Sequence, residues 1–257
     1  ARHGWSAPSV SAAMVRLAFV TTNQGKVDFL RLVLEDVIAE GKLEGIDTNA
    51  EVDLPEVQAD SVDVICRAKA EAAFRTLRRP LVVQDSGFAI AALNGFPGPY
   101  TKYVLARIGV DGLLKLMEGN RDRRCGFVAC VGYADELGEV RVFQEPRQYF
   151  GTMRESRASK PEGSAVGRAW GDSTGELFEI FVPDDAASGG LASAEMSKEQ
   201  LNEYRRRRNS AFKAFAEWWS GKEQESLQPV RLDAEASAPQ PPAPKRRKRD
   251  QDPEAPS

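Results

Sequence analysis

The stretch LVVQDSGFAIAALNGFPGPYTKYVL runs from Leu81 to Leu105 and organises the rest of the chain. It opens with the apolar residues 81–83, which are typical of a buried strand, and then changes abruptly to Gln-Asp-Ser-Gly at 84–87. In an open α/β sheet, ligands bind at the carboxyl ends of the strands, which is where this carboxylate and glycine are expected. The sequence therefore predicts a strand that ends before Asp85, with a functional site at that end.

A rigid turn follows in the same stretch, with the sequence Asn-Gly-Phe-Pro-Gly-Pro-Tyr at 94–100. Its glycines and prolines impose special backbone positions that a plain connecting loop does not need. Short motifs of this kind also occur in ordinary strands and surface turns, so a purely structural interpretation stays open at this point.

The composition is that of an ordinary globular protein. The chain has 257 residues, of which 42% are hydrophobic and 28% charged, and this length suits one large domain or two small ones. The net charge of -3 gives no global attraction to nucleic acid, so nucleic-acid binding is not expected of the main domain. No run of about 18 apolar residues occurs, so we expect no membrane span.

The numbers and positions of the cysteines and histidines exclude several kinds of catalytic and metal site. Cys66, Cys125 and Cys130 lack metal-ligand spacing and stand among apolar or helical residues, which predicts reduced thiols that fill the core. The only histidine is His3, so histidine-based triads, His-rich zinc sites and imidazole general bases are excluded. Reduced thiols favour a reducing compartment, and we expect a cytoplasmic protein.

The first predicted element is a buried strand at 16–20, followed by the turn Thr-Thr-Asn-Gln-Gly-Lys at 21–26 and a helix at 27–39. A helix start that carries a lysine offers backbone N–H groups, a positive dipole end and an ammonium group, all of which suit phosphate. The glycine spacing is not that of a Walker loop. A simple connection between strand and helix is the alternative interpretation of this turn.

Six further elements follow from hydrophobic periodicity and turn signals. They are a strand at 46–54, helices at 61–77 and 104–117, a hairpin of strands at 126–134 and 139–144, a strand at 177–183 and a helix at 197–219. A proline stops the second strand and leaves Glu56 at its end, and the last helix opens with a Ser-x-x-Gln capping box. The polar residues 146–175 cannot be assigned to an element.

Two basic runs stand out in the last part of the chain. Arginines fill positions 205–208 of the last helix, where like charges repel unless an anion or carboxylates compensate. The tail at 221–257 is rich in Pro, Ala, Glu and Ser and is predicted to be disordered, as is the segment 1–14. Within the tail, the run from Lys245 to Arg249 is similar to a nuclear localisation signal, and a solvated basic run is the alternative.

Taken together, the motifs resemble the inosine triphosphate pyrophosphatase family over roughly residues 16–219. The matching residues are Thr21, Asn23 and Lys26 in a Thr-x-Asn-x-x-Lys turn, the Leu-Pro-Glu segment with Glu56, the helix lysine Lys69, the Asp-Ser-Gly of Asp85, Ser86 and Gly87, and the turn at 94–100. Several independent motifs in the right order are more specific than any one of them, which overturns the purely structural interpretations.

The resemblance implies an α/β fold of the domain at 15–220, with a mixed central β-sheet, flanking helices and two lobes around an active-site cleft. It implies hydrolysis of a nucleoside triphosphate such as ITP, dITP or XTP to a monophosphate and pyrophosphate, with Mg²⁺ as cofactor, and it predicts a homodimer. Glu56 and Asp85 suit Mg²⁺, and Asp85 also suits activation of water. Lys26 and Lys69 suit catalysis by neutralising phosphate charge. Thr21, Asn23, Lys26, Ser86 and Gly87 are the predicted substrate contacts.

The second half departs from the family pattern. The family's Phe-Gly-Tyr-Asp-Pro segment is replaced at 175–179 by Gly-Glu-Leu-Phe-Glu, so the stacking aromatic and the aspartate are missing in register. Trp170 and Asp172, or Phe178 in a shifted register, are the predicted replacements. Gln84 replaces an acid that relatives usually carry beside the catalytic aspartate.

The family's Ser-His-Arg is here three arginines at 206–208. Arg207 and Arg208 are therefore predicted to contact substrate, either at the base or in place of a lost family lysine. The leading hypothesis is an active pyrophosphohydrolase with altered base preference. The alternative is a nucleotide- or RNA-binding module that kept the fold and lost the enzyme, motivated by the rewritten pocket and the basic runs.

Overall fold

The computed structural model describes residues 15–48, 52–159, 173–185, 188–208 and 210–221. The chain divides into two compact units, 1–223 and 224–257, and the second lies outside the described residues. The predicted disordered segments at 1–14 and 221–257, with the basic run from Lys245 to Arg249, also lie outside them except for residue 221. No helix in the described part of the chain is long and apolar enough to cross a membrane.

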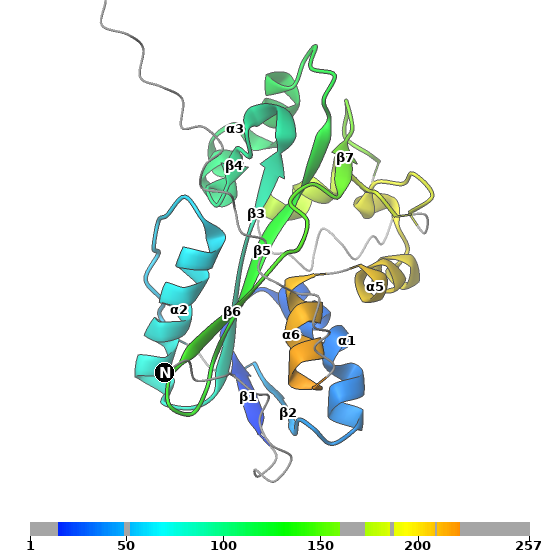
Figure 1. Ribbon diagram of the computed structural model, residues 1–257. Coiled ribbons are helices and arrows are strands. Elements are labelled where there is room, and N and C mark those ends of the chain that lie inside the picture. Colours follow the sequence, from blue (N-terminus) through cyan, green and yellow to red (C-terminus); the bar gives the residue numbers. More distant parts are fainter. Residues whose placement is uncertain (1–14, 49–51, 160–172, 186–187, 209, 222–257) are drawn as a thin grey trace, which may run out of the picture. The chain divides into compact units, whose positions relative to one another are not determined.

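A mixed β-sheet of eight strands forms the centre of the first unit (Figure 1). Its main order is β2-β1-β3-β5-β7-β8; β1 is parallel to β2 and β3, and the other pairs are antiparallel. The strands are β1 Arg16–Phe19, β2 Gly45–Asp47, β3 Leu81–Ile90, β4 Pro97–Gly98, β5 Arg124–Ala134, β6 Val140–Gln144, β7 Gly151–Met153 and β8 Phe181–Pro183. The predicted mixed sheet with flanking helices is confirmed.

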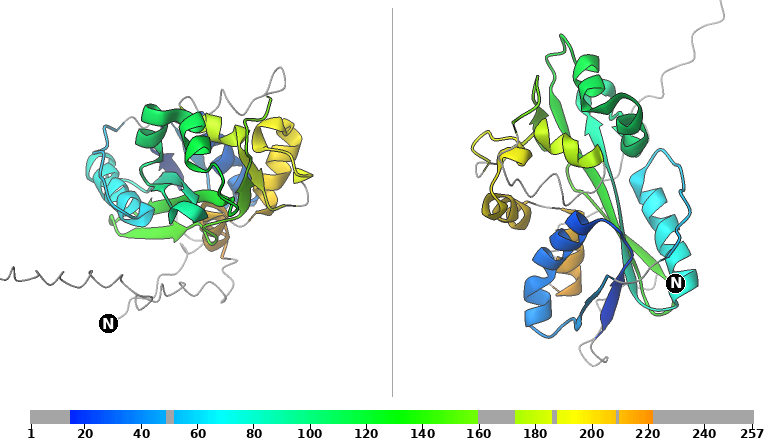
Figure 2. Two further views of the ribbon diagram at one scale, coloured as in Figure 1. Left: turned by 90° about the horizontal axis from the view of Figure 1, so that it is seen from above. Right: turned by 180° about the vertical axis from the view of Figure 1, so that it is seen from behind.

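Helices cover both faces of the sheet. The helices are α1 Gln24–Ala39, α2 Val62–Leu77, α3 Thr101–Leu116, α5 Lys198–Arg207 and α6 Ala211–Trp219, with short 3₁₀ helices η1 Ala91–Leu93, η2 Ser173–Glu179 and η4 Ser193–Glu195. Figures 1 and 2 show α2 on one face of the sheet, with α1 and α6 on the other. The alternation of side chains explains this, because Leu17 and Phe19 pack with α1 and α6, whereas Ala18 and Val20 pack with α2.

A second core surrounds the far halves of β3 and β5. Phe88 of β3 packs there with Leu113 of α3, with Phe181 of β8 and with Leu177 of η2. The long β3 and β5 therefore run through two lobes. In one lobe, a core with α1 and α6 lies on one face of the sheet and a core with α2 on the other; the second lobe has a core with α3, η2 and β8. This arrangement gives the two predicted lobes, and residues 84–87 of β3 lie between them.

The strand that carries Asp85 is longer than predicted. It continues from Leu81 to Ile90, and Asp85 pairs with Cys130 of β5 in the middle of the ladder. The prediction of a strand end before Asp85 was wrong because a run of polar residues is tolerated inside a strand where one face borders a cavity. The polar side chains at 84–86 are half-buried at that face.

Three other element predictions need correction. The strand predicted at 46–54 is limited to β2, with bounds Gly45–Asp47. Of the predicted strand 177–183 only β8 is extended, because Leu177 of the preceding 3₁₀ helix and Ile180 just after that helix pack into the second core. The helix predicted at 197–219 is two helices, because Arg208 is extended (φ -69°, ψ 140°) and Ser210 starts α6 as its N-cap.

Candidate active site

A cavity of about 990 Å³ lies between the core that contains α2 and the core that contains α3. Its lining comes from the turn after β1, the loop before α2, the middle of α2, the middle of β3 and the start of α3. Eight residues singled out from the sequence line it together: Thr21, Asn23, Lys26, Glu56, Lys69, Asp85, Ser86 and Gly87. These residues span more than 60 positions of sequence, so the fold brings the separate motifs to one place.

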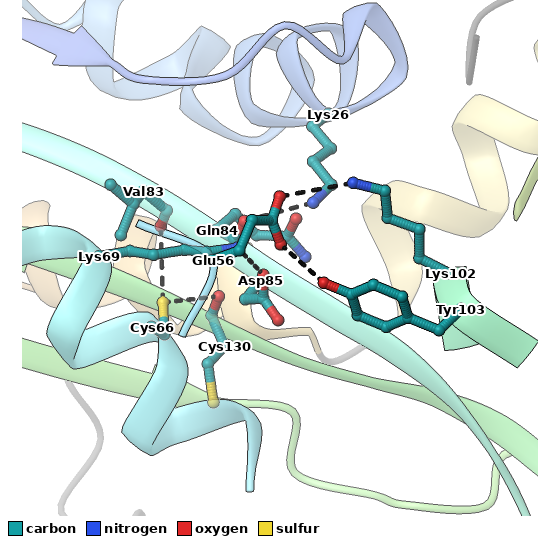
Figure 3. Close-up of polar contacts among 10 residues, drawn as sticks. All are labelled: Lys26, Glu56, Cys66, Lys69, Val83, Gln84, Asp85, Lys102, Tyr103 and Cys130. Carbon is teal, nitrogen blue, oxygen red and sulfur yellow. Dashed lines mark hydrogen bonds and ion pairs between the residues drawn. The ribbon is translucent and has the colours of Figure 1, made fainter. Parts of the chain in front are cut away.

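The turn after β1 is held by its own side chains. Thr21 Oγ1 accepts a hydrogen bond from the Asn23 N–H at 3.1 Å, and Asn23 Oδ1 accepts one from the Lys26 N–H at 3.1 Å. Asn23 is thus the N-cap of α1, and the positive end of the helix dipole faces the cavity lining. The Lys26 ammonium extends across to donate to the backbone carbonyl of Gln84 at 3.3 Å, directly beside Asp85 (Figure 3).

Lys69 and Asp85 form the central ion pair of the cavity. Lys69 Nζ lies 2.5 Å from Asp85 Oδ1, and both side chains are mostly buried. α2 brings the lysine over β3 because the thiol of Cys66, one turn earlier, donates to backbone carbonyls of β3 and β5 (Figure 3). Burial, and secondarily the charge of Asp85, raise the pKa of the Cys66 thiol to about 12. The thiol therefore stays protonated and unreactive, and it contributes to packing only.

The other two cysteines confirm the prediction of core thiols. Cys125 and Cys130 are free and fully buried, and burial raises the pKa of both thiols. They pack in the two different cores that β5 crosses.

Glu56 faces the same cavity from the loop before α2. Its carboxylate is exposed and is contacted by Lys102 Nζ and by the Tyr103 hydroxyl, each at 3.4 Å (Figure 3). Lys102 and Tyr103 belong to the first turn of α3 and line the cavity, yet the sequence analysis did not single them out. Their position directly after the turn at 94–100 is the signal that would have identified them.

Carboxylates that could hold a divalent cation are present but not clustered. Asp53, Glu56 and Asp85 all line the cavity, but no group of three or more His, Cys, Asp or Glu within the described ranges forms a ready metal cage. Mg²⁺ is commonly held by one or two carboxylates together with waters and substrate phosphates. The donor set around the cavity therefore fits a cation that arrives with a phosphorylated ligand.

Comparisons with known proteins assign the family. The sequence profile of the Ham1 family matches residues 17–218. The chain belongs to the Ham1 family. The resemblance to the inosine triphosphate pyrophosphatases is thereby confirmed, because relatives of this Ham1 chain carry such names.

Two relatives and one solved structure illustrate the match. The dITP/XTP pyrophosphatase of Methanopyrus kandleri is 34% identical over 205 residues, which cover 80% of this chain and 96% of the relative. The inosine triphosphate pyrophosphatase 2 of Trypanosoma cruzi is 35% identical over 188 residues, covering 73% and 84%. The Ham1 protein of Staphylococcus aureus, 21% identical, has the same fold with a TM-score of 0.60, covering 81% of this chain and 100% of its own.

A second, smaller cavity adjoins the first in this Ham1 chain. It measures about 50 Å³ and shares Lys26, Gln84 and Phe127 with the lining of the large cavity. Phe178 lines the small cavity and stacks on Phe127 with ring centroids 5.2 Å apart. The structure thus brings Phe178 to the cavity wall, whereas Trp170 and Asp172 lie outside the described residues.

The positive charge of the arginines at 205–208 is compensated by nearby carboxylates, and Arg205 packs over an aromatic ring. Arg206 pairs with Glu35 at 3.0 Å, and Arg207 lies 4.0 Å from both Asp185 and Glu203. Arg205 is buried with its guanidinium over the Phe29 ring, and burial lowers its pKa to about 10.

The structure separates the two arginines that were predicted to contact substrate. Arg208 lines the small cavity and pairs with Glu145 at 2.8 Å. Arg207 has a half-exposed side chain and is not among the described residues that line either cavity. Only Arg208 is therefore placed to reach a ligand that extends from the large cavity.

Proposed function

We propose that this chain is a nucleoside triphosphate pyrophosphohydrolase that acts on ITP, dITP or XTP. The observation that carries the proposal is the meeting of Lys26, Lys69 and Asp85 in one cavity of about 990 Å³, a size at the upper end for small-molecule sites. The names of the relatives, dITP/XTP pyrophosphatase and inosine triphosphate pyrophosphatase, support the same reaction.

In the proposed reaction, water attacks the α-phosphorus, a new P–O bond forms, and the bond to the bridging oxygen breaks to release pyrophosphate. Asp85 orients the water and takes its proton, a role that suits a carboxylate held in place by Lys69. Lys26 and Lys69 neutralise the charge that grows on the phosphate oxygens. Thr21 and Asn23 would hold the triphosphate by hydrogen bonds at the start of α1, where the helix dipole is positive.

We infer that the enzyme uses Mg²⁺, with Asp85 and Glu56 as its protein ligands. When bound, such an ion polarises phosphate oxygens and adds positive charge to the cavity. Glu56 is exposed and contacts only long, flexible side chains among the described residues, so its carboxylate can turn to a new partner. Lys102 and Tyr103 would then be released toward the substrate.

A substrate panel tests the proposal directly. The protein is incubated with ITP, dITP, XTP and the four common ribonucleoside triphosphates, each with Mg²⁺ or with EDTA, and the released pyrophosphate is measured. Release from the inosine and xanthosine nucleotides, absent with EDTA, is the expected result. No release from any nucleotide at high enzyme concentration would refute the activity.

The competing proposal is a nucleotide- or RNA-binding module without catalysis, for which the compensated arginine run offers little support. Because Arg206 and Arg208 are already paired with carboxylates, they provide less free positive charge than the sequence indicates. Salt-sensitive RNA binding without hydrolysis would favour that module. We also propose a homodimer, which sedimentation analysis of the full chain would test.

A further inference from the structure

One arginine outside the large cavity joins two elements of the lobe that contains α3, η2 and β8. Arg157 lies four residues after β7, and its Nε donates to Glu179 at 2.6 Å while Nη2 donates to Glu176 at 2.5 Å. Both glutamates belong to η2. A third carboxylate, that of Asp111 in α3, lies 3.5 Å from the same guanidinium. A planar guanidinium can hold two glutamates in fixed directions at once, which a lysine ammonium on a flexible stem does less rigidly.

The three carboxylates differ in how firmly they are held. The Glu179 side chain is 6% exposed, and its backbone carbonyl also accepts a hydrogen bond from the Ala158 N–H at 2.9 Å. A buried charge pair is costly to break, because the charge that remains has no water around it. The Glu176 side chain is 40% exposed and that of Asp111 is 75% exposed, so solvent screens these two pairs. Glu179 is therefore the main anchor through which Arg157 holds η2.

η2 forms part of the wall of the large cavity. Thr174 and Leu177 of η2 line that cavity, and Leu177 also packs in one core with Leu113 of α3. Arg157 is not among the described residues that line either cavity, so it acts on a ligand only through the elements that it holds. The groups proposed to react belong to other elements, α1, α2 and β3.

We propose that Arg157 is a positioning residue of the substrate site: by binding Glu179 and Glu176 it fixes η2, and with it Thr174 and Leu177, against α3. The proposal rests on the proposed function, because it concerns the nucleotide that enters the large cavity. Since a substitution would move the wall and leave the reacting groups in place, it weakens nucleotide binding and leaves the chemical step nearly unchanged.

The first test compares Arg157→Gln with a matched control, Arg154→Gln. The Arg154 side chain is also 36% exposed and pairs with a carboxylate, that of Glu195 in η4, at 2.8 Å. Neither Arg154 nor Glu195 is among the described residues that line a cavity. In the hydrolysis of ITP with Mg²⁺, Arg157→Gln is expected to raise KM roughly tenfold and to leave kcat within about twofold. The control is expected to keep both constants. An unchanged KM, an equal rise in the two variants or a loss confined to kcat would overturn the proposal.

Two measurements without turnover separate this proposal from the activity itself. Hydrogen exchange followed by mass spectrometry is expected to show faster exchange of the η2 amides in Arg157→Gln than in the parent or in Arg154→Gln. Titration calorimetry with ITP in EDTA is expected to show binding that is roughly tenfold weaker in Arg157→Gln alone. If the parent protein releases no pyrophosphate from any nucleotide, the proposed function fails, and these two measurements still decide the role of Arg157. Unchanged exchange in η2, or equal affinity for ITP in the parent and in Arg157→Gln, would overturn it.

Arg157→Gln removes the guanidinium from a buried carboxylate and can lower the stability of the fold. A double-mutant cycle with Glu179→Gln is therefore the second test, because the double variant has no charge at either position. If Arg157 acts through Glu179, the substitution Arg157→Gln raises KM much less in the Glu179→Gln background than in the parent protein. Circular dichroism checks that each variant is folded. Additive effects on KM in folded variants would mean that Arg157 acts by another route, and the proposal would be wrong.

Discussion

The substitution Gly87→Ala tests how closely the chain approaches itself at the site. Gly87 lies in the middle of β3 and lines the large cavity, next to the residues that pair with β4. A Cβ at this position would lie 2.5 Å from the carbonyl carbon of Gly98, closer still to its oxygen, and 3.1 Å from Pro99 N. These obstacles are backbone atoms, so no side-chain rotation can relieve the contact.

The expected loss of stability follows from how far β4 has to move. Carbon atoms pack best at about 3.5–4.0 Å, so β4 has to shift by on the order of 1 Å. The turn resists, because Thr101 Oγ1 accepts from the Phe88 N–H at 2.7 Å and donates to the Gly98 carbonyl at 2.6 Å. Overpacking of this kind costs about 1–3 kcal/mol, which in a chain of this size lowers the melting temperature by roughly 2–12 °C.

Thermal unfolding followed by circular dichroism measures the effect, with Gly132→Ala as control. Gly132 lies on the adjacent strand β5, and a Cβ there meets its nearest atoms at 3.2 Å, a distance that small shifts can relieve. We expect Gly132→Ala to stay within about 1 kcal/mol of the parent protein. If Gly87→Ala unfolds at the same temperature as the control, the close approach of β3 and β4 described above is wrong.

Three further outcomes follow from the geometry of the site. Asp85→Asn is expected to lower turnover by about 10²–10⁴-fold with an unchanged far-ultraviolet spectrum, since the amide cannot take a proton from water; near-parental turnover would contradict the role of Asp85. Lys102→Met is expected to raise the KM for the triphosphate more than it changes the Ki of a monophosphate competitor, because the ammonium lies at the cavity lining and the triphosphate carries more negative charge; equal effects would argue against phosphate contact. The Cys66 thiol, with a pKa of about 12 against an ordinary 9.0, is expected to resist a thiol reagent at pH 8 until the chain is unfolded. The free energy of unfolding should then fall as pH rises above 9, since the unfolded chain loses the thiol proton first; rapid labelling of the folded protein would contradict the burial.

The sequence predicted the elements whose signals are local. The helices at α1 and α2, the hairpin of β5 and β6 and the capping box at Ser197 were all expected, and Ser197 Oγ accepts from the Gln200 N–H as predicted. The errors fall where tertiary contacts outweigh local pattern. The extended residue Arg208 interrupts an otherwise helical sequence because its side chain reaches Glu145, 63 residues earlier.

The residues of the site show the same difference between local signals and tertiary contacts. Thr21, Asn23 and Lys26 line the large cavity and belong to one short turn, and their spacing alone indicates how the N-cap and the ammonium are arranged. Lys102 was missed because a lysine at the start of a helix is usually solvated and carries no signal by itself. Arg207 was predicted to contact substrate, but only its three-dimensional neighbours reveal that it points to Asp185 and Glu203.

The arginine run illustrates why the lining of the small cavity resisted prediction. From sequence, four adjacent arginines require compensation, but the compensating groups lie far along the chain, at Glu35, Glu145 and Asp185. Glu145 follows the hairpin strand β6 and carried no signal of its own, since a single glutamate after a strand is most often solvated. Its burial against Arg208 turns it into an acceptor at the closed end of an aromatic cavity. The turn at 21–26 thus depends on contacts within one short segment, whereas the Glu145–Arg208 pair and the Lys69–Asp85 pair depend on contacts between separate segments, which is why the turn was predictable from sequence and the two pairs were not.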